Sequence, residues 1–209
     1  LGVTTLVGSA GNKRSFSVHG DVVGELHDGG AFTPEHGSYE ATIELELVDG
    51  EWRISSLPSG VVLERSEMRD EYQPYDLYFF DPAGNELITD RRWVYARRES
   101  LPSALISLLT QGPSDRLQPA VSGPNALASA EEEDATIAYT GFNDGAYEFT
   151  GFGGMDEQTR KQFAAQVVWT LASAGVTGPY NLQADGEALF DGADKLTVDD
   201  FAEFSPLVD

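Results

Sequence analysis

Three histidines are the side chains of this chain best suited to bind a metal ion or to exchange protons near neutral pH: His19, His27 and His36. A zinc site needs such ligands to converge on one point. Spacings of eight and nine residues place these histidines on different strands or turns instead of on one helix face. We therefore expect exposed histidines, and the sequence predicts neither a metal nor another cofactor.

Carboxylates are abundant but form no catalytic pattern. The chain holds 35 Asp and Glu residues, and no spacing among them singles out an acid–base pair. The sequence contains no Gly-x-Ser-x-Gly elbow, phosphate-binding glycine loop or His-Glu-x-x-His pair. GFGGM at 151–155 lacks the lysine of a phosphate loop and predicts a turn. Thr197 and Asp200 fit the cap of a short final helix better than a calcium loop. The sequence therefore predicts a protein that is not an enzyme.

Arginine and tryptophan side chains supply the remaining candidates for a binding surface, because both residue types are enriched at protein interfaces. Two arginine pairs flank the end of an expected strand, and one tryptophan falls beside the apolar stripe of an expected helix. The alternative is an ordinary strand end with charged flanks. The candidate partner contacts are Arg91, Arg92, Trp93, Arg97, Arg98 and Trp169. Trp52, in contrast, is expected in a core.

The charge balance excludes several classes of partner. Thirty-five acidic against 13 basic residues give a formal net charge of -22, which opposes binding to nucleic acids and anionic lipids. The acidic run at 131–134 predicts a solvated loop. The chain has no cysteine, and hence no disulfide or thiolate site, and no stretch is long enough to span a bilayer. Because it opens without a methionine, we expect a trimmed sequence.

The first sixty or so residues predict an antiparallel sheet. Residues 39–47 alternate between apolar and polar, and Asp49-Gly50 predicts a two-residue hairpin that pairs Leu45 with Ile54 on the apolar face. No helix in this region covers that face. The cover must come either from the second half of the chain or from helices that precede Leu1. The charged segment 65–76 is the best candidate for a domain boundary.

The second half mixes strands and helices. One helix is expected from Ser100 as N-cap to Gly112-Pro113, which we interpret mainly as a stop signal, and another from Asp156 to Gly175. Asn143-Asp144-Gly145 predicts a second hairpin. The predicted fold class is α+β, with a small antiparallel-sheet domain at 1–66 and, at 72–209, a sandwich of two helices on one face of a mostly antiparallel sheet.

Several of these motifs occur together in a known family. DLYFFDP, ELITDRRWV, LPSALISLLTQGPSDRLQPAV, RKQFAAQVVWTLA and LQADGEAL resemble a GerMN domain, over about Tyr72 to Leu189. The preceding GEWRISSLPSGVVLERSEMRDEYQPYDLYFFDP is similar to the junction in actinobacterial LpqB lipoproteins. GerMN domains often show a Pro followed by a strand that leads into a Val-Asp-Leu-like element. This chain has VSGPNALASAEEEDATIAYTGF there, a longer and more acidic loop, so the resemblance carries over no ligand contact at that loop.

The resemblance implies a lipid-anchored protein outside the cytoplasmic membrane, in which these two domains precede a β-propeller. It further implies association with the extracytoplasmic sensor of the MtrB histidine kinase, and through it with the MtrA response regulator. Helices that precede the sheet of the first domain are also implied, so that 1–66 would be a truncated domain. The family brings no catalytic residues. The alternative function is a module that binds cell-wall glycan or another small ligand.

Overall fold

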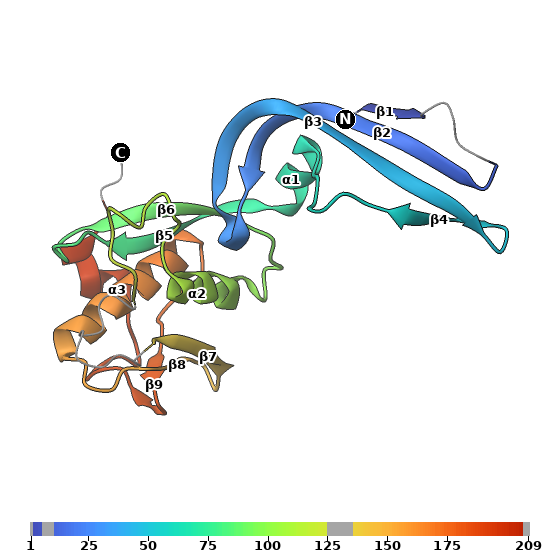
Figure 1. Ribbon diagram of the computed structural model, residues 1–209. Helices are drawn as coiled ribbons and strands as arrows, with labels where there is room; N and C mark the ends of the chain where they lie inside the picture. Colours follow the sequence, from blue (N-terminus) through green and yellow to red (C-terminus); the bar gives the residue numbers. More distant parts are fainter. Residues whose placement is uncertain (1, 6–10, 125–135, 207–209) are drawn as a thin grey trace. The chain divides into compact units, whose positions relative to one another are not determined.

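The chain divides into two units, each described here by itself. The structure, a computed structural model, describes residues 2–5, 11–124 and 136–206. Unit 1 comprises Leu1–Asp28 and Phe32–Tyr72, and unit 2 comprises Gly29–Ala31 and Gln73–Asp209 (Figure 1). Three residues that follow β2 in the chain therefore belong to unit 2. The predicted acidic loop at 131–134 lies outside the described residues.

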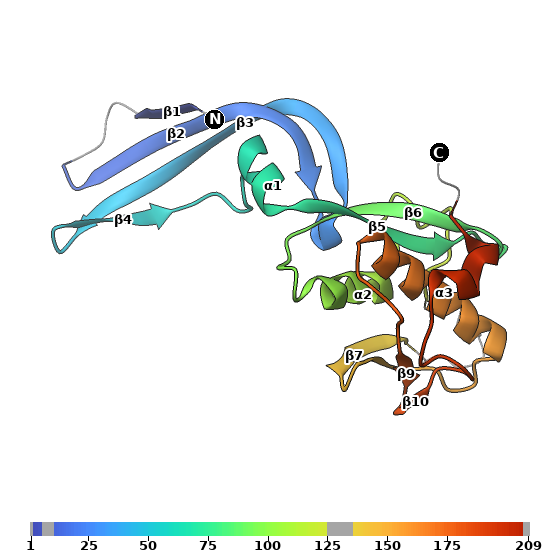
Figure 2. The ribbon, with the colours of Figure 1, turned by 180° about the vertical axis from the view of Figure 1, so that it is seen from behind.

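Unit 1 is built on one antiparallel sheet whose strands are neighbours in chain order, β1-β2-β3-β4. The two long strands bend together along their length (Figure 2), and their register shifts between Val22 and Gly24, where a bulge increases local twist and bending. The strands are β1 (Gly2–Thr5), β2 (Lys13–Leu26), β3 (Phe32–Val48) and β4 (Glu51–Ser56). The short 3-10 helix η1 (Asp28–Gly30) follows β2.

The predicted hairpin between β3 and β4 is confirmed. Asp49 and Gly50 have φ values of 53° and 85°, which is the left-handed pair required by a two-residue turn. The register pairs Leu45 with Ile54 and Leu47 with Trp52, as alternation predicts. Trp52 is, however, half-exposed instead of buried in a core, and the Arg14 guanidinium lies 4.4 Å from its ring centroid.

The apolar side chains of the unit 1 sheet are only partly buried. No described residue of this unit is buried. Apolar side chains on its strands remain in contact with solvent, including Ile54 at 57% and Leu47 at 37% exposure. A sheet with one apolar face is stabilised when another layer packs on it, and which part of the protein supplies that layer stays open between the two expected sources.

The expected boundary segment, 65–76, contains the division between the two units, after Tyr72, but it is regular structure and not a linker. Arg65–Glu71 form helix α1, whose capping box includes the bond from Glu64 N to Glu67 Oε2 at 2.8 Å. Strand β5 then begins at Gln73. Arg, Glu and Met favour helices, and the missed start signal was a glutamate at the N-cap, where Ser, Thr, Asp or Asn is usual.

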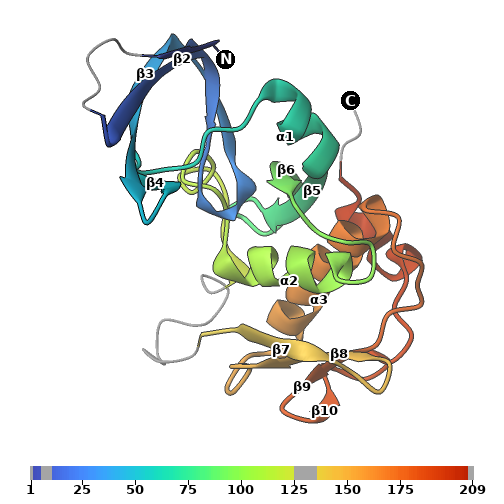
Figure 3. The ribbon, with the colours of Figure 1, turned by 90° about the vertical axis from the view of Figure 1, so that its right-hand side faces the viewer.

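Unit 2 has helices between two sheets. Sheet β5-β6 contains β5 (Gln73–Phe80) and β6 (Leu87–Val94). Sheet β10-β9-β8-β7 contains β7 (Ala138–Asn143), β8 (Ala146–Thr150), β9 (Leu182–Ala184) and β10 (Glu187–Ala188). The helices α2 (Leu101–Gln111) and α3 (Glu157–Ser173) lie between them (Figure 3), and the 3-10 helix η3 (Val198–Phe204) follows.

This layering corrects part of the prediction. The α+β class and the two helices are confirmed, but the helices do not share one face of a single sheet. Helix α3 packs on both sides. The ring centroids of Phe163 and Phe149 of β8 are 5.0 Å apart. On the other side, Thr170 Oγ1 accepts a hydrogen bond from Tyr78 N of β5 at 3.2 Å. A helix with two packed faces fits a middle layer.

The predicted helix ends of unit 2 are confirmed. Helix α2 ends before Gly112, whose φ is 104°, and the side chain of Asp156 caps α3 by accepting from Thr159 N at 2.7 Å. Ser100 stands at the N-cap of α2, but its hydroxyl donates to Arg97 O instead of capping the helix. No helix among the described residues is long and apolar enough to cross a membrane.

Candidate functional site

The predicted contact arginines lie in unlike environments. Arg91 is exposed and forms two hydrogen bonds with Asp76, from Nε to Oδ1 at 2.8 Å and from Nη2 to Oδ2 at 3.1 Å. These bonds and the charge of Asp76 raise the pKa of Arg91 above its ordinary value. Arg97 and Arg98, in the segment that follows β6, are exposed.

Arg92 is buried, which corrects its assignment as a partner contact. Its side chain is 4% exposed. Its Nε and Nη2 atoms donate to Asp90 Oδ2 at 3.0 and 2.7 Å. Nη1 donates to Gly29 O at 2.9 Å, and Nη2 also donates to Gly112 O at 3.1 Å. Alternation along β6 places residues 90, 92 and 94 inward. The sequence signal for this buried pair was an acidic and a basic residue two positions apart on one strand.

The turn after α2 completes the same network. Ser114 N donates to Asp90 Oδ2 at 2.7 Å, and Ser114 Oγ donates to Asp90 Oδ1 at 2.9 Å. We call Asp90, Arg92 and Ser114, with the carbonyl of Gly112, the Asp90 node. The segment at 112–114 therefore does more than end a helix, because it supplies the donors and the acceptor that make a buried ion pair tolerable.

The two tryptophans are both half-buried. Trp93 lies on β6, next to Arg92. Trp169 lies on α3, and its Nε1 donates to Phe201 O of η3 at 3.3 Å, so it is tied to a different part of unit 2. Partner contact by Arg91, Trp93, Arg97, Arg98 and Trp169 stays a prediction.

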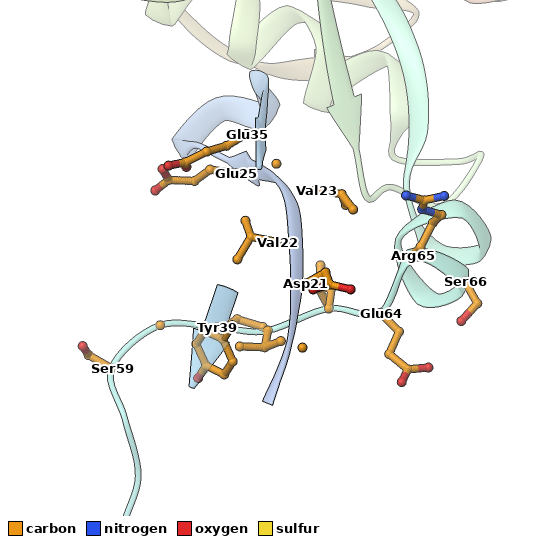
Figure 4. Close-up of a pocket in the computed structure, with 16 residues that line it drawn as sticks. Asp21, Val22, Val23, Glu25, Glu35, Tyr39, Ser59, Glu64, Arg65 and Ser66 are labelled. Carbon is orange, nitrogen blue, oxygen red and sulfur yellow. The ribbon is translucent and has the colours of Figure 1, made fainter. Parts of the chain in front are cut away.

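A groove in unit 1 was not predicted from the sequence. It has a volume of about 620 Å³ and is lined by residues 20–25 of β2, Glu35 and Tyr39 of β3, and residues 59–66 (Figure 4). Valine and leucine side chains supply its apolar part. Its charged residues are Asp21, Glu25, Glu35, Glu64 and Arg65. Glu25 and Glu35 extend in the same direction at one end of it (Figure 4).

The sequence signal for the groove is a short apolar run, because Val61 is 86% exposed and Val62 and Leu63 are 43% and 39% exposed. Three consecutive apolar residues outside any strand or helix are unusual on a surface without a binding role or a missing cover. Sequence reasoning assigned this run only to a family motif.

The histidines do not gather at one place. His27 Nε2 lies 3.0 Å from Thr33 Oγ1, and no group of three or more His, Asp or Glu residues within the described part of the chain could hold a metal ion. The perturbed tyrosines belong to the packing of unit 2. Burial raises the pKa of Tyr147 to about 12, and burial also raises the pKa of Tyr139, whose hydroxyl is 2.9 Å from Ser103 Oγ.

Comparison with known proteins gives the family. Residues 3–69 match the family described as lipoprotein LpqB, N-terminal domain, and residues 76–190 match the family described as sporulation and spore germination, the GerMN-type domain. Lipoprotein LpqB of Corynebacterium diphtheriae is 40% identical over 212 residues, which cover 98% of this chain and 35% of that protein. This chain belongs to the LpqB lipoprotein family.

Other LpqB proteins are similar to this chain over a comparable range. The Rhodococcus opacus lipoprotein LpqB is 43% identical over 183 residues, covering 84% of this chain and 31% of that protein. The chain thus spans about a third of the length of the curated LpqB relatives that it matches. Among solved structures, the tandem GerMN domains of the sporulation protein GerM from Bacillus subtilis align with a TM-score of 0.42 and 17% identity, over 62% of this chain and 47% of that chain.

The family resemblance read from the motifs is therefore confirmed, and the relatives are named lipoproteins. Neither matching family is described as an enzyme.

Proposed function

We propose that these two domains form a non-enzymatic regulatory module on the extracytoplasmic face of the cell membrane, held there by a lipid anchor in the full-length protein. Its partner in this proposal is the extracytoplasmic sensor domain of an MtrB-like histidine kinase, which acts on an MtrA-like response regulator. The observation that carries the proposal is membership of the LpqB lipoprotein family across nearly the whole chain.

The mechanism is a shift between states of the sensor. A module that binds one state of the kinase more tightly than the other changes their populations by no more than the ratio of the two affinities. An acidic surface with a formal net charge of -22 favours a partner with basic patches, and it speeds their encounter at low salt.

Calorimetric titration of this protein with the purified sensor domain tests the proposal. We expect saturable binding that weakens between low and high salt, because charged surfaces are screened within about 10 Å at 0.1 M salt. Absence of heat at both salt concentrations, with both proteins folded, would remove the kinase contact from these two domains.

A pair of variants locates the contact. Arg97→Glu with Arg98→Glu reverses two exposed charges without touching the Asp90 node. If these arginines face the partner, affinity falls by at least about tenfold, as expected for rim charges that mismatch. Arg53→Glu with Arg116→Glu makes the same charge change at exposed positions elsewhere and serves as the control. Equal loss in both variants would assign the effect to net charge alone.

The groove of unit 1 favours a second candidate, a small-ligand module for cell-wall glycan. Its volume of about 620 Å³ lies within the usual range for ligand sites, and Tyr39 offers an aromatic surface for a sugar ring. Titration with soluble peptidoglycan fragments should then shift the amide resonances of residues 20–25 and 59–66. A flat titration at millimolar concentration would dismiss this candidate.

A further inference from the structure

The groove of unit 1 runs along an edge of strand β2. All of its lining residues belong to unit 1, and residues 20–25 of β2 line it in unbroken succession (Figure 4). Successive side chains of a strand point to opposite faces of the sheet, so a groove on one face is lined by every second residue. An unbroken run indicates a groove that approaches the strand from its side, where the backbone is within reach.

This side of β2 has no strand partner among the described residues. Strand β3 pairs along the whole of β2, apart from the register shift between Val22 and Gly24. On the other side of β2, strand β1 pairs only with Phe16–His19. Beyond His19, alternate residues of β2 therefore direct their N–H and C=O groups away from β3, as the residues of an edge strand do.

Apolar side chains form another part of the groove. They come from β2, from β3 and from the segment between β4 and α1. An extended chain in this groove buries apolar side chains while its backbone pairs with β2, which is the combination that proteins use when a peptide adds a strand to a sheet. The apolar lining residues are Val22, Val23, Tyr39, Val61, Val62 and Leu63.

The charges of the groove favour a basic occupant. Its acidic lining residues are Asp21, Glu25, Glu35 and Glu64, against the single base Arg65. A second copy of this chain would bring the same acidic edge, and like charges on opposite strands destabilise their pairing. The acidic residues therefore discourage pairing between copies, and they attract a strand of opposite charge.

We propose that this groove binds an extended, apolar segment of a partner protein that carries lysine or arginine, and that the segment adds to β2 as a strand beyond the end of β1. Backbone hydrogen bonds hold the segment, and the carboxylates of Glu25 and Glu35, which extend in the same direction (Figure 4), bind its cationic side chain. Any protein with such a segment is a candidate partner. A negative titration with the kinase sensor therefore leaves this site standing, and the reverse also holds.

Titration of this protein with a synthetic peptide tests the site. The probe is a peptide of about eight residues in which valine and lysine alternate, since a strand is usually about 3–10 residues long. We expect saturable binding that slows amide exchange at every second residue of 20–26, where the N–H groups point away from β3. The amides between them already pair with β3 and should not change. Binding without this alternation would overturn strand addition.

Two altered peptides separate the sources of affinity. Glutamate in place of lysine should weaken binding by at least about tenfold, because it meets the carboxylates of the groove. Proline in place of every second valine removes backbone donors and should weaken binding by a similar factor. Equal affinity for all three peptides would contradict both parts of the proposed recognition.

A pair of protein variants locates the contact. Glu25→Gln with Glu35→Gln removes two charges from the groove and should lower affinity for the lysine peptide by about tenfold. Glu40→Gln with Glu44→Gln removes two exposed charges of β3 outside the groove lining and is the matched control. Unchanged exchange of the amides that pair β2 with β3 shows that each variant is folded. Equal loss of affinity in both variants would assign the attraction to net charge and remove the site.

Two other occupants give different results. If peptidoglycan fragments shift the resonances of residues 20–25 and the lysine peptide does not, the groove belongs to the glycan candidate. An extension of β1 toward earlier residues would run beside residues 20–26, because Gly2 pairs with His19 in antiparallel register. A longer version of the protein that no longer binds the lysine peptide would therefore assign the edge to the chain itself. Either result would overturn binding of a partner segment.

Discussion

The Asp90–Arg92 pair sets the strongest residue-scale constraint in unit 2, because both side chains are 4% exposed. Removing one member of a buried pair leaves an uncompensated charge and costs roughly 3–5 kcal/mol, whereas replacing both by apolar groups costs much less. We expect Asp90→Leu alone to lower the free energy of unfolding by about 3 kcal/mol. Asp90→Leu with Arg92→Met should cost less than the sum of the single substitutions. Urea denaturation of the two single variants and the double variant checks this. A cost of the double variant equal to the sum of the two single costs would contradict it.

A second residue-scale prediction concerns acid stability. The backbone N–H of Thr159 holds the pKa of Asp156 below its usual value of 3.8. A carboxyl whose folded pKa is depressed stabilises the fold above its unfolded pKa, and this contribution is lost as pH falls through the folded pKa. Asp156→Asn keeps a good N-cap but cannot titrate. Its stability should therefore change less than that of the parent as pH falls below 3.8. Thermal melts across this range, with exposed Asp115→Asn as control, measure the difference.

At the scale of elements, the partly exposed apolar side chains of the unit 1 sheet are the clearest target. LpqB resemblance predicts helices that precede this sheet, and Ile54 at 57% exposure is one of the side chains they would cover. Full burial of such a side chain contributes about 1.5–3 kcal/mol. A longer version of the protein that includes the preceding residues should exchange the amides of β2 and β3 more slowly, while those of α3 stay unchanged. Unaltered exchange in β2 and β3 would show that the cover comes from elsewhere.

Turns and helix caps that depend on residues close together in the sequence were predicted well. The turn at Asp49-Gly50 and the cap at Asp156 depend on residues within four positions of each other, so the sequence fixes them without knowledge of the rest. The second sheet of unit 2 was missed because helix α3 carries a polar side chain, Thr170, toward β5 as well as an apolar one, Phe163, toward β8. Which layer each face meets is decided by contacts distant in sequence.

The candidate site was harder to predict for the same reason. Arg92 has the residue type of an interface and the position of a core side chain. The hydrogen-bond partners of the Asp90–Arg92 pair come from residues 29 and 112–114, which are distant in sequence. The groove likewise combines β2, β3 and a segment after β4, which no single pattern joins.

Because of the net charge of the whole molecule, added salt should act in opposite directions on folding and on binding. A net charge of -22 on 209 residues destabilises the compact state through self-repulsion, and salt screens that repulsion. The melting temperature should therefore rise as sodium chloride increases from about 10 mM, where the Debye length is near 30 Å, to about 1 M, where it is near 3 Å. Affinity for a basic partner should fall over the same range, because salt also screens the attraction between these acidic charges and the partner's basic charges. Melting curves and titrations on one set of buffers test both signs together. A melting temperature that falls with salt would mean that local ion pairs such as Arg91–Asp76 outweigh the long-range repulsion.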